Sequence, residues 1–397
     1  MRGIWKAGWL LVVVCMPGIA SADSWLPATR KEYLSADRQW RLQVDPRPLT
    51  GAGAYFEDAV AGKAKPGGLE GDPQDSAVGT MAHQVGGQWQ TVWRKPLRND
   101  VAPVAVVVLS GGAFMTLDNW HSMGYGRDAV VLYNASGEPS GHYALVDFLP
   151  AEYVKVLPRS VSSLQWRGTA RANSDGRTIT VPVVIPRQDT TGRSPGAYFP
   201  VIFEPRSGTF GQPHGPAWER AKASARVALA AMEREHAAER RRFTDPLFAP
   251  GRSAAEEWHY YLREAFYRLD PQWEQCYPSV RVLRGSAPMA TDALARWLLD
   301  STACAQVLAA PSQNALVVQL AGVSKAIEPG SLAQKRLYLA LDATHFAQAG
   351  TALAASGVQL FQVDPSVGIA QRPERLAAWD EADKAIAAEE LEQGAGR

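Results

Sequence analysis

The order of apolar and polar positions divides the chain into two parts with different periods. From residue 23 to about residue 210, short apolar runs alternate with turn signals, which is typical of strands joined by tight turns. From residue 217 onward, apolar residues recur at the spacing of amphipathic helices. The pattern predicts an α+β chain with a β-rich domain over 23–210 and a mainly α-helical domain over 217–397.

The β-rich part contains several predicted hairpins. Gly86-Gly87, Ser110-Gly111-Gly112 and Asp175-Gly176 each separate two apolar runs, and such glycine turns favour antiparallel pairing. Successive hairpins predict an antiparallel meander, arranged as a sandwich or as propeller-like sheets. A closed propeller needs about four blades of four strands. This segment has strands for two or three blades, so the pattern favours a sandwich or an open sheet.

The second part has helical stripes at 217–236, 258–269, 294–298, 332–355 and from 373 onward. One strand is expected among them, at 358–363. The segment 208–216 is rich in Gly and Pro and predicts the linker between the two domains. We expect most of the apolar stripes to be core.

Residues 1–22 have the pattern of a secretory signal. Arg2 and Lys6 give the segment a basic start, and an apolar run covers residues 7–16. Ala20-Ser21-Ala22 then matches a cleavage site before Asp23. The apolar run is about half the length that a membrane-spanning helix needs. The pattern predicts a periplasmic or secreted protein with no membrane span after cleavage. The alternative is an uncleaved anchor helix.

Composition and charge narrow the class of protein. Apolar residues make up 46% and charged residues 20% of the chain, as in ordinary globular proteins. The formal net charge of +1 argues against a strongly basic nucleic-acid binder, so we expect no nucleic-acid partner. Of the three cysteines, Cys276 and Cys304 lie outside the signal. An exported protein favours a disulfide between them, and the alternative is two buried free thiols.

The densest polar and aromatic segment covers residues 116–128. Its candidate ligand-binding residues are Asp118, Asn119, Trp120, His121 and Tyr125. Asp118 and His121 would serve as an acid–base pair, Asn119 as an oxyanion donor, and the two aromatic rings as a surface for a sugar or peptide. The alternative is structural, because Asp and Asn close turns on neighbouring backbone and glycine permits positive φ.

A second cluster, at residues 160–166, contains Ser160, Ser162 and Ser163 before Trp166. A serine nucleophile would normally lie in a G-x-S-x-G turn between a strand and a helix, and that context is missing. Alternating serines more often solvate one face of a strand. No metal-binding, phosphate-binding or dinucleotide motif is present in the sequence, so it predicts neither a metal nor a cofactor.

These two clusters carry a resemblance. Gly87-x-Trp89, Asn99 with Pro103, the T-x-D-N-W-H-S-x-G-Y-G block from Thr116 and S-V-S-S-x-x-W from Ser160 resemble a group of predicted secreted bacterial proteins without an assigned activity. The resemblance covers roughly residues 24–166. It implies an exported β-rich module and transfers no catalytic residue.

Three hypotheses follow from the sequence. The first is an exported, non-enzymatic binding or interaction protein whose partner is an unknown envelope or extracellular ligand or protein. The second is an envelope-directed hydrolase that uses Asp118 and His121 as acid and base. The third makes the helical part an oligomerisation or docking element. Whether the protein is an enzyme is left open at this point.

Overall fold

A computed structural model describes residues 26–51, 53–55, 67–69, 76–160, 162–187, 197–251, 255–283, 289–300 and 302–394. The predicted signal at 1–22 lies outside the described residues. The chain is α+β, as predicted, with most strands in the N-terminal half and most helices in the C-terminal half. The chain divides into two compact units, with boundaries between Glu235 and His236 and between Ala385 and Ile386.

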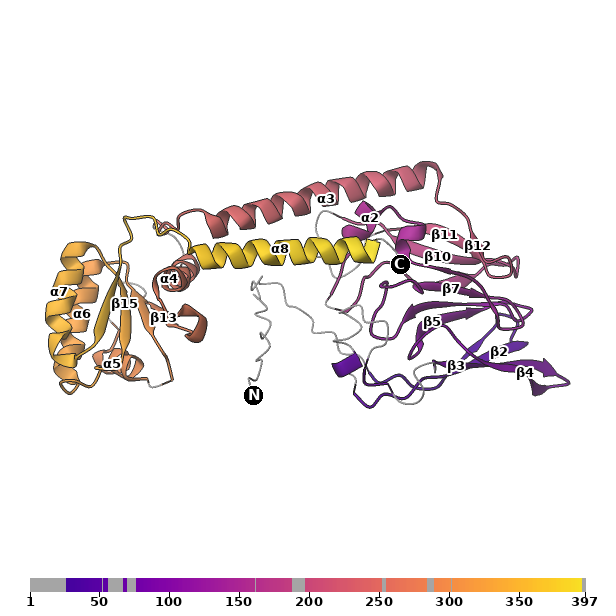
Figure 1. Cartoon of the computed structure of the whole chain (residues 1–397), viewed down its shortest axis with the longest axis horizontal. Helices are drawn as coiled ribbons and strands as arrows, with labels where there is room; N and C mark the ends of the chain where they lie inside the picture. The colour runs from indigo at the N-terminus through magenta and orange to yellow at the C-terminus, as the bar shows by residue number, and fades with distance from the viewer. Residues whose placement is uncertain are drawn as a thin grey trace, which may run out of the picture. The chain divides into compact units, whose positions relative to one another are not determined.

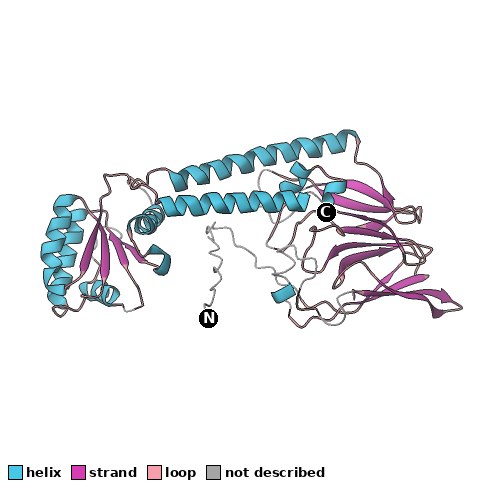
Figure 2. Ribbon diagram, in the orientation of Figure 1, coloured by secondary structure: helices cyan, strands magenta, loops and turns pink. Residues whose placement is uncertain are grey.

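The first unit contains three antiparallel sheets of four strands each, and in every sheet the strands pair in chain order (Figures 1 and 2). The predicted antiparallel meanders are therefore confirmed. The first sheet comprises β1 (Lys31–Leu34), β2 (Trp40–Asp45), β3 (Val78–Val85) and β4 (Gln88–Pro96). The second comprises β5 (Pro103–Val108), β6 (Phe114–Asn119), β7 (Val130–Tyr133) and β8 (Pro139–Tyr143). The third comprises β9 (Arg171–Ala172), β10 (Ile179–Val184), β11 (Tyr198–Glu204) and β12 (Thr209–Phe210).

The three sheets are stacked as layers, and the second sheet lies in the middle (Figure 1). Phe114 and Tyr133 of the second sheet pack with Met81 of the first sheet. Met115, on the opposite face of β6, packs with Phe203 of the third sheet. Because the middle sheet is covered on both faces, β6 and β7 are buried almost throughout and lack the alternation of a half-exposed strand.

Helical segments pack on the buried face of the third sheet, the same face that carries Phe203. The short elements η1 (Leu145–Asp147) and α2 (Ala151–Lys155) lead from the second sheet toward the third. The long helix α3 (Gly215–Thr244) begins inside the segment expected as a linker. Near its start, Trp218 packs against Tyr153 of α2 and Phe199 of β11, with ring centroids 5.5 and 4.9 Å away.

The second unit is built on a four-stranded parallel sheet with the order β13-β14-β15-β16. Helices α5, α6 and α7 pack on one face of this sheet, and α4 packs on the other. The element order is α4 (Ala255–Leu269), η2 (Trp273–Gln275), β13 (Ser279–Val282), α5 (Thr291–Leu299), β14 (Gln306–Ala309), α6 (Gln313–Ala326), β15 (Arg336–Ala340), α7 (Ala343–Leu353), η3 (Ala354–Ser356), β16 (Gln359–Val363) and α8 (Pro373–Gly394).

Two expectations for this half were wrong in detail. The strand expected alone at 358–363 is β16, which pairs with β15 in the parallel sheet. The helix expected over 332–355 is in fact β15 followed by α7. The cause is burial on both faces. A short parallel strand with helices on both sides reads as a continuous apolar run, which periodicity alone does not separate from a buried helix.

The predicted disulfide is confirmed. Cys276 and Cys304 are joined, with their Cα atoms 5.7 Å apart. Cys276 lies just before β13 and Cys304 just before β14. The disulfide therefore links the N-terminal ends of two paired strands. Within the described residues, every helix is too short or too polar to cross a membrane.

Candidate functional site

The sequence-predicted site begins at the end of β6, where Asp118 is fully buried. One carboxylate oxygen accepts hydrogen bonds from the Gly124 amide at 2.8 Å and from the Trp166 indole at 2.7 Å. The other oxygen accepts from Arg167 Nε at 2.8 Å and lies 2.6 Å from Arg167 Nη2. A carboxylate offers about four acceptor positions. These four donors occupy them, and the Asp118 side chain has no exposed surface for a substrate.

The Asp118 carboxylate joins two clusters that are separate in the sequence. The segment at residues 160–166 lies against the block, because the Leu164 amide donates to the Met123 carbonyl at 2.8 Å. Gly124 has a positive φ of 78°, and a Cβ there would lie 2.8 Å from the Leu164 Cβ. Glycine is therefore required at this close approach. The two clusters are therefore in direct contact and form one packed region.

Backbone geometry adds to this picture. Asp118 and His121 have φ values of 60° and 67°, in the left-handed region. Asp and His are among the residues that enter this region more readily. Asn119 is held by the loop before β5, since Asn99 Nδ2 donates to its Oδ1 at 2.8 Å. The same Asn99 amide also donates to the Asp118 carbonyl, at 3.1 Å.

The aromatic residues of the segment 116–128 pack against other parts of the protein and are buried or half-buried. Trp120 is 7% exposed and lies 6.0 Å from the Tyr55 ring, measured between centroids. Its indole N–H donates to the Leu26 carbonyl at 3.1 Å, which ties the first described residues to the block. His121 and Tyr125 are half-buried, and Tyr125 packs against the core between the second and third sheets. The structure thus brings the five candidate residues into one region and gives most of them structural contacts.

Two carboxylates in the second unit, one fully buried and one partly buried, have a comparable architectural role. Asp270 is fully buried and accepts hydrogen bonds from Arg336 Nη1 at 2.7 Å and from the Tyr338 hydroxyl at 2.7 Å. Burial is the main cause that raises the pKa of Tyr338, and the Asp270 hydrogen bond adds to it. Glu264 receives two hydrogen bonds from Arg375, at 3.0 and 3.1 Å. Each of these carboxylates is satisfied by groups of the chain itself.

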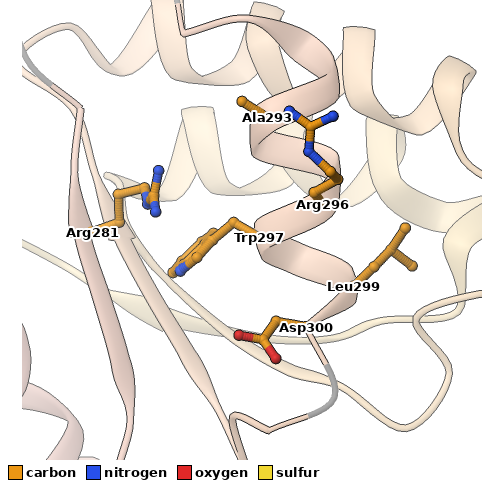
Figure 3. A pocket seen from close by; sticks show the side chains of 6 residues that line it. All are labelled: Arg281, Ala293, Arg296, Trp297, Leu299 and Asp300. Atoms are coloured by element: carbon orange, nitrogen blue, oxygen red, sulfur yellow. The ribbon is translucent and has the colours of Figure 1, made fainter.

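A shallow, open pocket lies in the second unit, between β13, the first strand of the parallel sheet, and α5 (Figure 3). Its lining residues are Arg281, Ala293, Arg296, Trp297, Leu299 and Asp300. The Trp297 ring lies between Arg281 of β13 and the axis of α5, with Arg296 toward one end of the pocket and Asp300 toward the other. The pocket therefore combines an indole with charged groups of both signs.

The centre of this pocket is an arginine over an aromatic ring. Arg281 Cζ lies 5.2 Å from the centroid of the Trp297 ring, within the range of a cation–π contact. The Trp297 indole N–H donates to Ser279 Oγ at 2.9 Å, which fixes the ring against β13. Arg281 Nη1 also lies 3.5 Å from Met289 Sδ. These contacts hold the Arg281 side chain in one place before any ligand arrives.

The carboxylate at the other end is engaged locally. Asp300 accepts hydrogen bonds from the Thr302 amide at 2.9 Å and from its hydroxyl at 2.8 Å. These bonds hold the pKa of the Asp300 carboxyl below its ordinary value. Arg281 and Arg296 therefore give the pocket a surplus of positive charge over this one carboxylate.

The described residues contain no group of three or more His, Cys, Asp or Glu side chains arranged to hold a metal ion. The sequence interpretation missed the pocket because it missed β13. Recognising a strand at 279–282 would have placed Ser279 and Arg281 beside the predicted helix that carries Trp297.

A comparison with protein-family models finds no match for the chain, and a comparison with curated proteins finds none either.

Proposed function

We propose that the chain is an exported protein that acts by binding a partner and not by catalysis. The observation that carries this proposal is the Asp118 carboxylate, which is fully buried and accepts from Gly124, Trp166 and Arg167. A general acid or base must reach the proton that it moves, directly or through one water. Asp118 lacks that access, so the geometry favours a scaffold role for the block.

The export part of the proposal rests on two features. The sequence of residues 1–22 has the basic start, apolar run and small-residue cleavage pattern of a secretory signal. The Cys276–Cys304 disulfide is the kind of bond that persists in oxidising compartments. The two features are independent, because one is a sequence pattern at residues 1–22 and the other is a bond in the second unit.

The binding part rests on the pocket beside Trp297. Small-molecule sites are usually concave and enclose most of their ligand. This pocket is open and shallow, and it presents a guanidinium already positioned on an indole. Arginine and tryptophan are the residues most enriched at energetically important points of protein interfaces. Such a surface suits contact with a partner molecule.

Export is tested by expressing the full chain in a bacterial host with a periplasm and measuring the mass of the protein in each fraction. The proposal predicts a periplasmic or secreted form that begins at Asp23. A control variant with Ala20 and Ala22 replaced by Glu is expected to keep the signal attached. Recovery of the unprocessed wild-type chain in the cytoplasm would contradict export.

Binding is tested by cross-linking the purified protein to envelope extract, with Arg281→Gln and Arg241→Gln as paired variants. Arg241 is exposed and does not line the pocket. The proposal predicts a partner of unchanged mass that Arg281→Gln loses and Arg241→Gln retains. A partner recovered only as cleaved fragments would contradict a purely binding role.

A further inference from the structure

The strand β13 lies at the end of the parallel sheet, and within the described residues it pairs with β14 alone. The Ser279 amide donates to Ala305 and the Leu283 amide donates to Ala309, both at 2.9 Å. Alternate residues of a parallel strand direct their peptide groups to opposite sides. Val280 and Val282 therefore present their N–H and C=O groups away from β14. Such an edge is a template for another strand.

The two faces beside this edge differ in chemistry. On the α5 face, Arg281 lies over Trp297, and Arg296 adds a second guanidinium to the same pocket. On the α4 face, Val280 and Val282 are half-buried and pack against the apolar cluster around α4. The edge thus separates a positively charged side from an apolar side.

We propose that the β13 edge and the Arg281 pocket dock an extended peptide segment in which acidic and apolar residues alternate. Successive side chains of a strand point to opposite faces. An added strand would place every second side chain on the side of Arg281 and Arg296, and the others on the apolar side of β13. This inference rests on the proposed binding function and names the class of partner for it.

Charge complementarity selects the acidic face of that peptide. A guanidinium that lies flat on an aromatic ring keeps its N–H fork available at the ring edge for a carboxylate. Arg281 Cζ lies 5.2 Å from the centroid of the Trp297 ring, and Arg296 is an exposed residue of the same pocket. Asp300 is engaged by Thr302 and leaves one guanidinium in excess in the pocket. A carboxylate on the docked strand would balance that excess.

The test measures fluorescence anisotropy of a labelled heptapeptide of alternating glutamate and valine, titrated with the purified full chain at low ionic strength, where surface charge is least screened. A peptide of the same composition with its glutamates and valines in separate blocks is the sequence control. Unlabelled glutarate serves as a competitor, because it offers carboxylates without a strand. Far-UV circular dichroism and thermal unfolding confirm that each protein variant is folded.

Three protein variants address the two halves of the site. Arg281→Gln and Arg296→Gln each remove one guanidinium and are expected to weaken binding about tenfold, the loss of one charge-assisted hydrogen bond. Val280→Pro removes an outward N–H, and proline is tolerated at an edge where the N–H does not serve the sheet. We expect this variant to fold and to lose binding severalfold. Arg241→Gln is expected to bind as the wild type does.

The proposal is supported if the alternating peptide binds saturably, the block peptide binds at least about tenfold more weakly, and the three site variants lose affinity. It is overturned if saturable binding is absent, or if Arg281→Gln and Val280→Pro bind as the wild type does. It is also overturned if glutarate displaces the peptide fully while Val280→Pro has no effect, since that marks a site for free carboxylates. Failure of these titrations in a correctly exported protein refutes the peptide class alone and leaves the proposed function standing.

Discussion

Asp118 and Arg167 form an ion pair in which the carboxylate is fully buried and the guanidinium side chain is 10% exposed. Asp118 is the second-last residue of β6 in the middle sheet. Arg167 precedes β9, and its backbone forms a bridge with Val183 of β10 in the third sheet. The pair therefore joins two layers of the first unit. The segment at residues 116–128, whose residue types most resemble a catalytic site, therefore connects two sheets.

Replacement of Asp118 by Asn tests this role. Asn tolerates the left-handed backbone of this position, so the change isolates the loss of charge. Arg167 would then be left buried without its carboxylate, and breaking a buried pair in this way costs about 3–5 kcal/mol of the free energy of unfolding. Urea unfolding measures the loss. The control Asp292→Asn, at an exposed position in the first turn of α5, should change the free energy by about 1 kcal/mol at most.

Replacement of Tyr261 by Phe is expected to stabilise the protein. Tyr261 is 1% exposed, and its hydroxyl has no hydrogen-bond partner among the described residues. Removing an unsatisfied buried hydroxyl should raise the free energy of unfolding by roughly 1 kcal/mol at neutral pH. Chemical unfolding of both proteins at pH 7 measures this gain. An equal loss of stability would instead reveal a partner for the hydroxyl.

The same variant has a predicted pH dependence. Burial, with a smaller contribution from the Asp364 charge, raises the pKa of Tyr261 to about 12, against an ordinary value of 10.0. The folded state therefore keeps the proton that the unfolded state releases above pH 10. The stability linked to this group is fully present below pH 10 and is lost as pH rises toward 12. The advantage of Tyr261→Phe over the wild type should grow between pH 10 and 12, as unfolding at pH 9 and pH 11 would measure.

Reduction of the disulfide should destabilise the second unit. Cys276 and Cys304 are 28 residues apart, and closing a loop of that size contributes about 3–4 kcal/mol in the chain-entropy model. Thermal unfolding with and without a reducing agent measures the difference. A variant with both cysteines replaced by Ser should match the reduced wild type and should not respond to the reductant. A wild type insensitive to full reduction would contradict this prediction.

Gly208 tests the close approach of the second and third sheets. It has a φ of 69°, and a Cβ there would lie 2.0 Å from the Ser140 carbonyl oxygen. Gly176 has a similar φ of 65°, but its nearest neighbour is a Ser110 Cβ at 3.9 Å. Gly176→Ala should therefore cost only the backbone strain, about 1–2 kcal/mol. Gly208→Ala should cost clearly more in urea unfolding, because the backbone of the second sheet must also move. Equal costs would show that the sheets separate easily.

The sequence was informative where one face of an element meets solvent or a glycine turn defines a hairpin. The Gly86-Gly87 hairpin became β3 and β4, and the helix from Pro373 became α8. It was uninformative where both faces are buried, as in β14, whose four residues Gln306–Ala309 are all buried. A strand covered by helices on both sides has no alternation to detect.

The candidate site shows the same limit. The residue types of the block are those of an acid–base site, and the sequence shows neither their burial nor their partners. Asp118 and Arg167 are distant in the chain from each other, and only the stacking of two sheets brings them together. The Arg281 pocket could not be predicted, because Arg281 lies on β13 and the hydrophobic periodicity did not predict that strand.

The central claim, that the protein binds and does not catalyse, is tested most directly by turnover. Wild type, Asp118→Asn and His121→Asn are incubated with peptidoglycan, glycans and model esters, each at the same concentration of folded protein. Asn suits the left-handed backbone at both positions. The account predicts background turnover by all three proteins. Clear turnover by the wild type would contradict it, and loss of that turnover in folded Asp118→Asn or His121→Asn would assign the catalysis to this block.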